Sequence, residues 1–444
     1  MKKLLSAVLI LVMVGAMFTA CAQEEPMMDD PTVAEEATTK AAPAKEDPTT
    51  EAATEAPMMV DKIKITSGLW SRPEEQQYIR EEILPGFTDA TGIEVELEVL
   101  AGADIEKLLT SQRDSGKWDS DIIMTHSGDM PKYIENDFAR PMDDLIGGLG
   151  ITVLGAFNES TKMNGSTYYI PISADVYLLI ANNKALPYLP AGVEVEAITW
   201  EQYKEWALAI AEVEGPKVTF PAQPIKSIQY QLGGISLSYG GGFPEINSDG
   251  MKAAWDLVGE LMAAGAIVET SFNYGDPIEL MKSEEAWLSF YHMVPVGDIY
   301  GSAPAKYTVA AAPAGPVGNG TIAGAWGIGI TSGTEKVEAA EEFIRFLTDP
   351  DILYKIAAGT GGFIPPVEEV IAELGNEPKD LIMKKGLDTL NNGIPSGVPG
   401  SLYTDFGAVK SVFDTVYKSM WDNNGTYTDA FLDEQQAALE ALLK

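Results

Sequence analysis

Cysteine and histidine, which often act as nucleophiles, proton carriers or metal ligands, are scarce in this sequence. The 444 residues include one cysteine, Cys21, and two histidines, His126 and His292. The motifs G-x-S-x-G and H-E-x-x-H and the P-loop pattern are missing from the sequence. Two acidic turns, at 247–250 and 422–425, hint at calcium loops but do not fit the ligand spacing of such a loop. No spacing singles out a carboxylate pair for glycoside hydrolysis. We therefore predict no catalytic residues, no cofactor and no bound metal.

Cys21 ends an apolar leader. Lys2 and Lys3 precede an apolar run over 4–18, and two small residues follow. This order is typical of a secretory leader. The stretch Phe18-Thr19-Ala20-Cys21 resembles the lipobox of bacterial lipoproteins, with Phe where Leu is usual. The resemblance implies a signal peptide over 1–20 and a lipid on Cys21; cleavage that leaves an idle thiol is the alternative.

Composition limits the partners of the chain. The formal net charge is -36, which repels nucleic acid and anionic lipid surfaces and favours a soluble monomer. Residues 21–60 are rich in Ala, Thr, Pro and Glu and hold ten acidic residues against two lysines. Such a segment buries too little apolar area to fold, so we predict a disordered acidic tether. We expect no nucleic-acid partner, and membrane contact only through the lipid.

The elements that must position a site begin at residue 61. Strands are predicted over 61–66, 93–99 and 119–124, and they alternate with helices over 73–91 and 104–114. This alternation indicates a mostly parallel sheet covered by helices, with ligand loops beyond the carboxyl ends of the strands. Further along, extended segments are predicted over 168–181, 308–312 and 322–331. Thr199 and Thr428 are predicted to cap helices.

Several segments match a known family in order along the chain. Residues 87–95 resemble "F-x-x-x-x-G-I-x-V", and 199–202 resemble "P-x-T-W-e-e". Further matches lie at 121–123, 138–145, 169–172, 182–184, 324–330 and 338–347. Together they resemble the family 1 extracellular solute-binding proteins, the ligand receptors of ABC importers that mostly carry carbohydrates.

The resemblance implies an α/β fold of the two-lobed, periplasmic-binding-protein-like (type II) kind, a clamshell whose strands cross the hinge. Lobe 1 would combine 62–173 with 317–364, and lobe 2 would combine 174–316 with 365–444. Small, Gly and Pro residues place the hinges near 172–174, 312–315 and 362–366. Ligand contacts that form only on closure would favour the closed state, which an ABC permease would recognise.

The implied function is therefore a non-enzymatic receptor that is anchored through Cys21 to the outer face of the cell membrane. It would deliver a mono- or oligosaccharide to the permease. The alternatives are a receptor for a polyol phosphate or polyamine, and a surface polysaccharide hydrolase or lyase.

The first set of ligand contacts implied by the resemblance lies in the loops of lobe 1 and beside the first hinge. A sugar site needs flat apolar faces and fixed polar groups. Trp70 packed on the first helix and Asp129 as a helix cap are the structural alternatives. This set comprises Trp70, Ser71, Arg72, His126, Ser127, Asp129 and Asp175.

The second set comes from later loops and strands. The segment 285–292 resembles "A-M-x-x-x-G-x-W" but lacks its small residue and final Trp, so we expect Tyr291 and His292 to substitute for them. The glycine-rich loop at 239–243 could equally be a long turn, and the late aromatic residues could equally anchor a helix. This set comprises Tyr239, Gly241, Tyr291, His292, Trp326, Tyr403 and Phe406.

Overall fold

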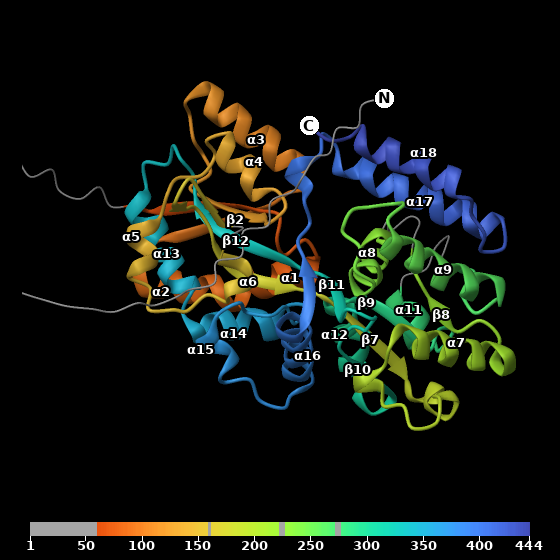
Figure 1. The fold of residues 1–444 in the computed structure, drawn as a ribbon. Coiled ribbons are helices and arrows are strands. Elements are labelled where there is room, and N and C mark those ends of the chain that lie inside the picture. Colours follow the sequence, from red (N-terminus) through yellow and green to blue (C-terminus); the bar gives the residue numbers. More distant parts are fainter. Residues whose placement is uncertain (1–59, 159–160, 222–226, 271–276) are drawn as a thin grey trace, which may run out of the picture. The chain divides into compact units, whose positions relative to one another are not determined.

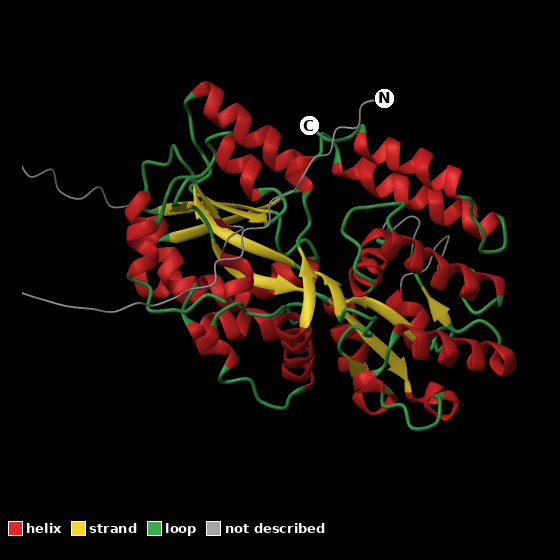
Figure 2. Cartoon of the chain, in the orientation of Figure 1, coloured by secondary structure: helices red, strands yellow, loops and turns green. Residues whose placement is uncertain are grey.

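Two β-sheets organise the part of the chain that the structure describes, which is residues 60–158, 161–221, 227–270 and 277–444 (Figures 1 and 2). The structure is a computed structural model. The predicted leader, Cys21 and nearly all of the acidic tether lie outside the described residues. Within the described ranges, every helix is too short or too polar to cross a membrane.

The first sheet has the order β2-β1-β3-β12-β6. The strands β1 (Lys62–Ser67), β2 (Glu94–Val99) and β3 (Ile122–His126) are mutually parallel. Strand β12 (Gly324–Ile330) runs antiparallel between β3 and β6 (Ile170–Asp175). The predicted alternation of strands and helices is thus confirmed, with one antiparallel strand inserted in the sheet.

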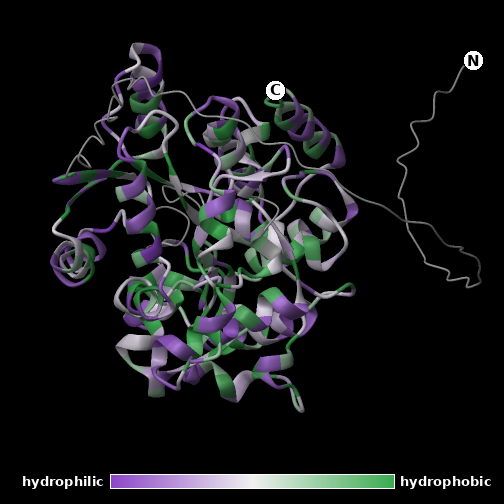
Figure 3. Cartoon of the chain, turned by 90° about the vertical axis from the view of Figure 1, so that its left-hand side faces the viewer, coloured by the Kyte–Doolittle hydropathy of each residue, from purple (hydrophilic) through white to green (hydrophobic). Residues whose placement is uncertain are grey.

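Helices cover both faces of this sheet because its strands alternate their side chains. Ile122 and Met124 of β3 face one apolar cluster with Phe87 and Phe343, whereas Ile123 faces a second cluster on the other side. Helices α3 (Gly102–Ser115) and α4 (Met130–Glu135) supply this second cluster. Figure 3 shows hydrophilic and hydrophobic residues alternating along outer helices, as expected for helices with one buried face.

The helix predicted over 73–91 contains an irregularity. It consists of α1 (Pro73–Tyr78), a π-helical segment η1 (Ile79–Ile83) and α2 (Leu84–Thr91). Gly92 then ends it in the left-handed conformation, with φ of 78°.

The second sheet has the order β10-β7-β9-β8. Its strands are β7 (Tyr177–Asn182), β8 (Val218–Thr219), β9 (Leu288–His292) and β10 (Tyr307–Ala310). β7 pairs antiparallel with β10 and β9, whereas β8 pairs parallel with β9, so this sheet is mixed. Thr199 caps α7 (Trp200–Glu214) by accepting a hydrogen bond from the Gln202 amide, as predicted.

The remaining elements cover the sheets and form the connections. Two small sheets pair β11 (Asn319–Ile322) with β13 (Gly393–Ser396), and β4 (Lys162–Met163) with β5 (Ser166–Thr167). The other helices are α5 (Asp143–Gly147), α6 (Gly155–Asn158), α8 (Ile228–Ser238), α9 (Asp249–Ala263), α11 (Pro277–Lys282), α12 (Met293–Ser302), α13 (Val337–Leu347), α14 (Pro350–Gly359), α15 (Glu368–Ile371), α16 (Pro378–Asn392), α17 (Phe406–Asp422) and α18 (Asp429–Glu440). Short 3-10 helices are η3 (Asn183–Tyr188), η4 (Val195–Ala197), η5 (Pro304–Lys306) and η6 (Gly400–Leu402).

Three neighbouring segments carry the chain between the two sheets. β6 continues directly into β7, and β11 continues into β12 through Ala323. A third segment runs beside β6, where Ala174 and Ile364 exchange backbone hydrogen bonds of 2.8 Å. The chain then packs α15 on α14 in the cluster of the first sheet and reaches the second sheet with α16. No crossing lies at 312–315, where a hinge is expected from the sequence, because Ala314 forms backbone hydrogen bonds with residues 198 and 200 beside the second sheet. The crossing instead falls at 322–324.

Candidate functional site

Two adjoining cavities open between the sheets, beyond the ends of β1, β3 and β9. The first has a volume of about 280 Å³ and the second about 340 Å³. His126, Asp129 and Trp326 line both of them. Of the predicted site residues, the cavities bring together seven: Ser71, His126, Asp129, Asp175, His292, Trp326 and Phe406.

Trp326 forms the wall that the two cavities share. Its strand pairs with β3, so the indole lies next to His126, with ring centroids 5.3 Å apart and the rings nearly perpendicular. Gly68 lies directly beneath the indole, since a Cβ atom there would come within 2.9 Å of Trp326. A glycine at the end of β1 therefore gives the indole its place, and the half-buried ring is a flat apolar surface within the cleft.

Asp175 lies where β6 crosses to β7, and the two histidines of the chain flank it. Asp175 Oδ1 is 3.4 Å from His292 Nε2. The Nδ1 atoms of both histidines accept backbone hydrogen bonds, His126 from Gly128 at 3.2 Å and His292 from Val294 at 3.3 Å. Each ring therefore carries its donor on Nε2 when neutral.

Asp175 is a buried carboxylate that interacts with both histidines. Burial lowers the pKa of His126, which favours its neutral form. Burial also opposes the charge on Asp175, but His292, His126 and the Gly324 amide outweigh it and lower the pKa of Asp175. Gly324 is required here, because a Cβ atom would lie 2.4 Å from His126 Nε2. Asp175 is thus ionised and held in place by the protein itself.

The second cavity also has an aromatic wall on the side of the second sheet. Tyr177 lies perpendicular to His292, with 5.8 Å between the ring centroids, and 6.1 Å from Tyr230. Phe406 and Lys410 extend from α17, where the Lys410 Nζ lies 5.5 Å from the centre of the Tyr230 ring. Polar and aromatic groups thus face the cavity from both sheets, which is typical of small-molecule sites.

Asp129 does not act as a helix cap. It precedes α4, but its carboxylate accepts no capping hydrogen bond. The carboxylate lines both cavities, and burial raises the pKa of Asp129. The structure therefore disfavours the capping alternative for Asp129.

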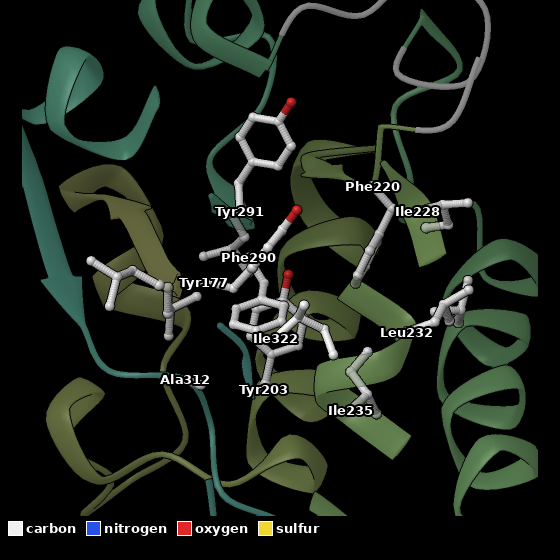
Figure 4. Close-up of a cluster of buried hydrophobic side chains, with 14 of the residues drawn as sticks. Tyr177, Tyr203, Phe220, Ile228, Leu232, Ile235, Phe290, Tyr291, Ala312 and Ile322 are labelled. Atoms are coloured by element: carbon white, nitrogen blue, oxygen red, sulfur yellow. The ribbon is translucent and has the colours of Figure 1, made fainter. Parts of the chain in front are cut away.

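Four predicted site residues lie outside both cavities and have partners within the protein, and their contact with a ligand stays a prediction. Trp70 is 2% exposed and packs in the core beside β1. Arg72 donates hydrogen bonds to Glu75 and Asp298 at 2.8 and 2.7 Å. Ser127 Oγ accepts from the Ala325 amide. Tyr291 belongs to the buried cluster under the second sheet, which Figure 4 shows together with Tyr177 and Ile322.

Three others lie outside the lining of both cavities. The Tyr239 hydroxyl donates to Glu201, and Gly241 packs against Gly250. Tyr403 is buried against Phe406, with ring centroids 6.1 Å apart. Their predicted contact with a ligand stays a prediction, as it does for the seven residues at the cavities.

Sequence reasoning missed a larger part of the lining. Tyr177, Tyr230 and Lys410 face the second cavity, and Gln76 and the loop 99–102 face the first. A signal existed for the loop, because it follows β2 at the same sheet edge as the loops after β1 and β3. Lys410 and Tyr230 come from helices whose packing depends on distant contacts, and no local pattern marked them. Among the described residues, no group of three His, Cys, Asp or Glu is placed to hold a metal ion.

Two sheets linked by three crossing segments, with a polar and aromatic cleft between them, define a two-lobed binding protein. Residues 83–385 match the family described as bacterial extracellular solute-binding protein, and the chain belongs to this family. The class predicted from the sequence is confirmed. No curated protein matches the chain in sequence.

Solved structures share the fold at low identity. The GacH receptor of Streptomyces glaucescens, described with acarbose, is 15% identical with a TM-score of 0.69 over 86% of this chain and 98% of that one. Maltose-bound MalE3 of T. maritima is 20% identical with a TM-score of 0.69 over 86% and 100%. UgpB of Mycobacterium tuberculosis, in complex with glycerophosphocholine, is 16% identical with a TM-score of 0.68 over 86% and 98%. One fold thus serves sugars and a phosphodiester, so the cleft must decide the ligand.

Proposed function

We propose that this protein is an extracytoplasmic receptor that binds a mono- or oligosaccharide and delivers it to an ABC permease. The observation that carries the proposal is the cleft wall at Trp326, a flat indole shared by two cavities that carboxylates, imidazoles and tyrosines surround. Indole faces stack on the C–H side of sugar rings, and fixed polar groups bind the hydroxyls. The sugar complexes of GacH and MalE3 support this choice of ligand.

Cleft closure is the proposed mechanism. Lobe 1 is 62–173 with 317–364, and lobe 2 is 174–316 with 365–444, with two adjustments. β11 packs on α8, which favours a boundary near residue 323, and α15 packs on α14, which favours a second boundary near residue 372. The two lobes contribute opposite walls of the second cavity, so a ligand there gains its full set of contacts only in the closed state. Binding then shifts the population towards that state, which the permease recognises.

The remaining parts of the proposal concern location and chemistry. The protein is a monomer that a lipid on Cys21 tethers to the outer face of the membrane, and the acidic segment acts as the spacer. It carries out no reaction on its ligand. The support is the leader in the sequence and the membership in an extracellular binding family.

A thermal-shift panel of sugars tests the receptor function. A ligand that binds only the folded protein raises its free energy of unfolding, by about 2.7 kcal/mol at a concentration of 100 times the Kd. The melting temperature therefore rises with ligand concentration. We expect saturable stabilisation by at least one neutral sugar, with the sugar recovered unchanged by mass spectrometry. Stabilisation that is lost in Trp326→Ala assigns the binding to the cleft. A panel without any stabilising sugar, or cleavage of a glycan, contradicts the proposal.

A further inference from the structure

Two opposite charges at the second cavity, the Asp129 carboxylate and the Lys410 ammonium, form no hydrogen bond or ion pair within the described part of the chain. Only longer-range attraction, from His126, Lys132 and Lys410, acts on Asp129. The other charges near the cavity are paired: Asp175 with His292, and Lys132 with Glu106. Unpaired charges in a partly buried site cost free energy. A binding site can accept this cost when the ligand supplies the missing partners.

Asp129 stands on the lobe 1 wall, at the contact with lobe 2. It follows Gly128, and a Cβ atom on Gly128 would come within 2.6 Å of the Val398 carbonyl oxygen. A Cβ atom on Gly400 would lie 3.6 Å from Asp129 Oδ1, so Gly400 also faces this carboxylate. The carboxylate therefore lies beside a tight contact between the loop after β3 and the segment before η6.

Lys410 stands on the opposite wall, one turn along α17 from Phe406. Residues four apart share a helix face, and the Lys410 Nζ lies 5.9 Å from the Phe406 ring centre and 5.5 Å from that of Tyr230. The two rings hold the ammonium by cation–π attraction, which leaves its N–H donors directed by no acceptor. The helix therefore presents a positioned cation to the cavity.

We propose that Asp129 and Lys410 form a charge clamp across the cleft that selects uncharged, hydroxyl-bearing ligands. One hydroxyl group of a neutral sugar in this cavity can donate to Asp129, and another can accept from Lys410. One neutral diol thus satisfies both charges and connects the two lobes. This inference rests on the proposed function, because it refines which sugars the same cleft accepts.

The clamp discriminates against both kinds of charged ligand. A carboxylate or phosphate group would pair with Lys410 but would meet the charges of Asp129 and Asp175. An amine would pair with Asp129 but would meet Lys410. Each charged ligand therefore leaves one like-charge contact in a partly desolvated site, where repulsion is weakly screened. A uronate, a polyol phosphate and a polyamine are all disfavoured by this geometry.

Titration calorimetry on the mature protein tests the clamp with named probes. The neutral probes are glucose, maltose and cellobiose, the anionic probes are glucuronate, digalacturonate and glycerol 3-phosphate, and the cationic probes are glucosamine and spermidine. We expect the wild type to bind at least one neutral probe, and to bind each charged probe at least about tenfold more weakly than that one. Tenfold corresponds to about one charge-assisted hydrogen bond.

The variants Asp129→Asn and Lys410→Met should relax the selection in opposite directions. Asp129→Asn should weaken the binding of neutral sugars about tenfold or more. It should also reduce the ratio between the affinities for neutral and for anionic sugars. Lys410→Met keeps the stem on the aromatic rings, and should narrow the gap to glucosamine instead. Lys418→Met on the same helix is the matched control, since Lys418 is exposed and pairs with Asp422. We expect unchanged binding in this control.

The outcomes separate the clamp from the receptor function. A wild type that binds a charged sugar as tightly as a neutral one overturns the clamp and leaves the sugar receptor standing. The clamp is also wrong when both variants change neutral binding less than twofold while they melt like the wild type. Binding of only glycerol 3-phosphate or spermidine, or of no probe, overturns the sugar function and the clamp together.

Discussion

Two places in the molecule each combine a tryptophan with charged side chains, and only one of them faces a cavity. After β1, Trp70 is buried and Arg72 is bonded to Glu75 and Asp298. In the cleft, Trp326 lines both cavities, and Asp129 and Lys410 are in the lining of the second one. The same residue types thus serve cohesion in one place and are available for binding in the other.

The difference lies in whether the protein satisfies its own polar groups. Burial opposes the charge of Arg72, but the hydrogen bonds with Glu75 and Asp298 overcome this and raise the pKa of Arg72. These bonds connect the segment before α1 to α12, which packs on the second sheet. In the cleft, by contrast, burial raises the pKa of Asp129, because His126, Lys132 and Lys410 attract the carboxylate only at longer range and do not outweigh the burial. Unsatisfied groups are therefore a better mark of a binding site than residue type.

The two tryptophans give the largest expected contrast. Trp70→Ala should lower the free energy of unfolding by about 3–5 kcal/mol, because it empties a filled core position. Trp326→Ala should instead weaken binding of the best neutral sugar at least tenfold, since it removes the face that both cavities share. Urea denaturation and calorimetry on both variants measure the two quantities. Equal loss of stability in both variants would contradict the contrast.

The charged residue after β1 should behave like its neighbouring tryptophan. Arg72→Met leaves Glu75 buried without its partner, and we expect a loss of about 2–3 kcal/mol of stability. The value is at the low end because the Arg72 side chain is 32% exposed. Sugar affinity should change less than threefold. Asp298→Asn is the control, since Glu75 keeps its partner, and we expect a loss below about 1 kcal/mol.

A large change in sugar affinity in Arg72→Met would support the ligand contact that the sequence predicts for Arg72. It would mean that the ion pairs open when ligand enters. Ultracentrifugation and small-angle scattering with and without sugar would then show whether the variant closes to the same dimensions. Unchanged dimensions and sugar affinity would indicate that Arg72 stabilises the fold and does not contact the ligand.

Much of the fold could be read from local patterns. The strand alternation at 93–99 and the Thr199 cap each depend on neighbours in sequence, and the structure confirms both. The π-helical turn at Ile79–Ile83 and the crossing at Ala323 could not be read, since each depends on distant packing. The expected hinge at 312–315 has the right composition, but Ala314 is bonded to residues beside α7.

The site was predictable only where it follows strand ends. Ser71 and Asp129 follow β1 and β3, His126 is the last residue of β3, and the sheet brings them to one edge. Trp70 comes from the same loop but has a left-handed backbone with φ of 62°, and its indole packs in the core. Local sequence gives no sign of this conformation in a tryptophan. Lys410 reaches the cavity only through the packing of α17 against α8.

The smallest expected effect has the opposite sign to the others. Asp129→Asn should raise the stability of the ligand-free protein at neutral pH by about 0.5–1 kcal/mol, because it removes an unpaired carboxylate from a partly buried site. Arg72→Met lowers stability and spares binding, so Asp129→Asn reverses both outcomes. Urea denaturation at pH 7 without sugar measures this gain, and a loss of stability would show that Asp129 has a partner in the protein.

The pH dependence of that gain follows from the direction of the shift. A carboxyl group whose pKa is raised on folding adds stability below its unfolded pKa of about 4, and this contribution is lost as the pH rises through the folded value. The gain from Asp129→Asn should therefore be present at pH 7 and disappear near pH 4, where both side chains are neutral. Urea curves at pH 4, 5.5 and 7 test this directly. A gain in stability that is equal at all three pH values would come from packing and not from charge. Asp129 would then not be an uncompensated carboxylate that a ligand could satisfy.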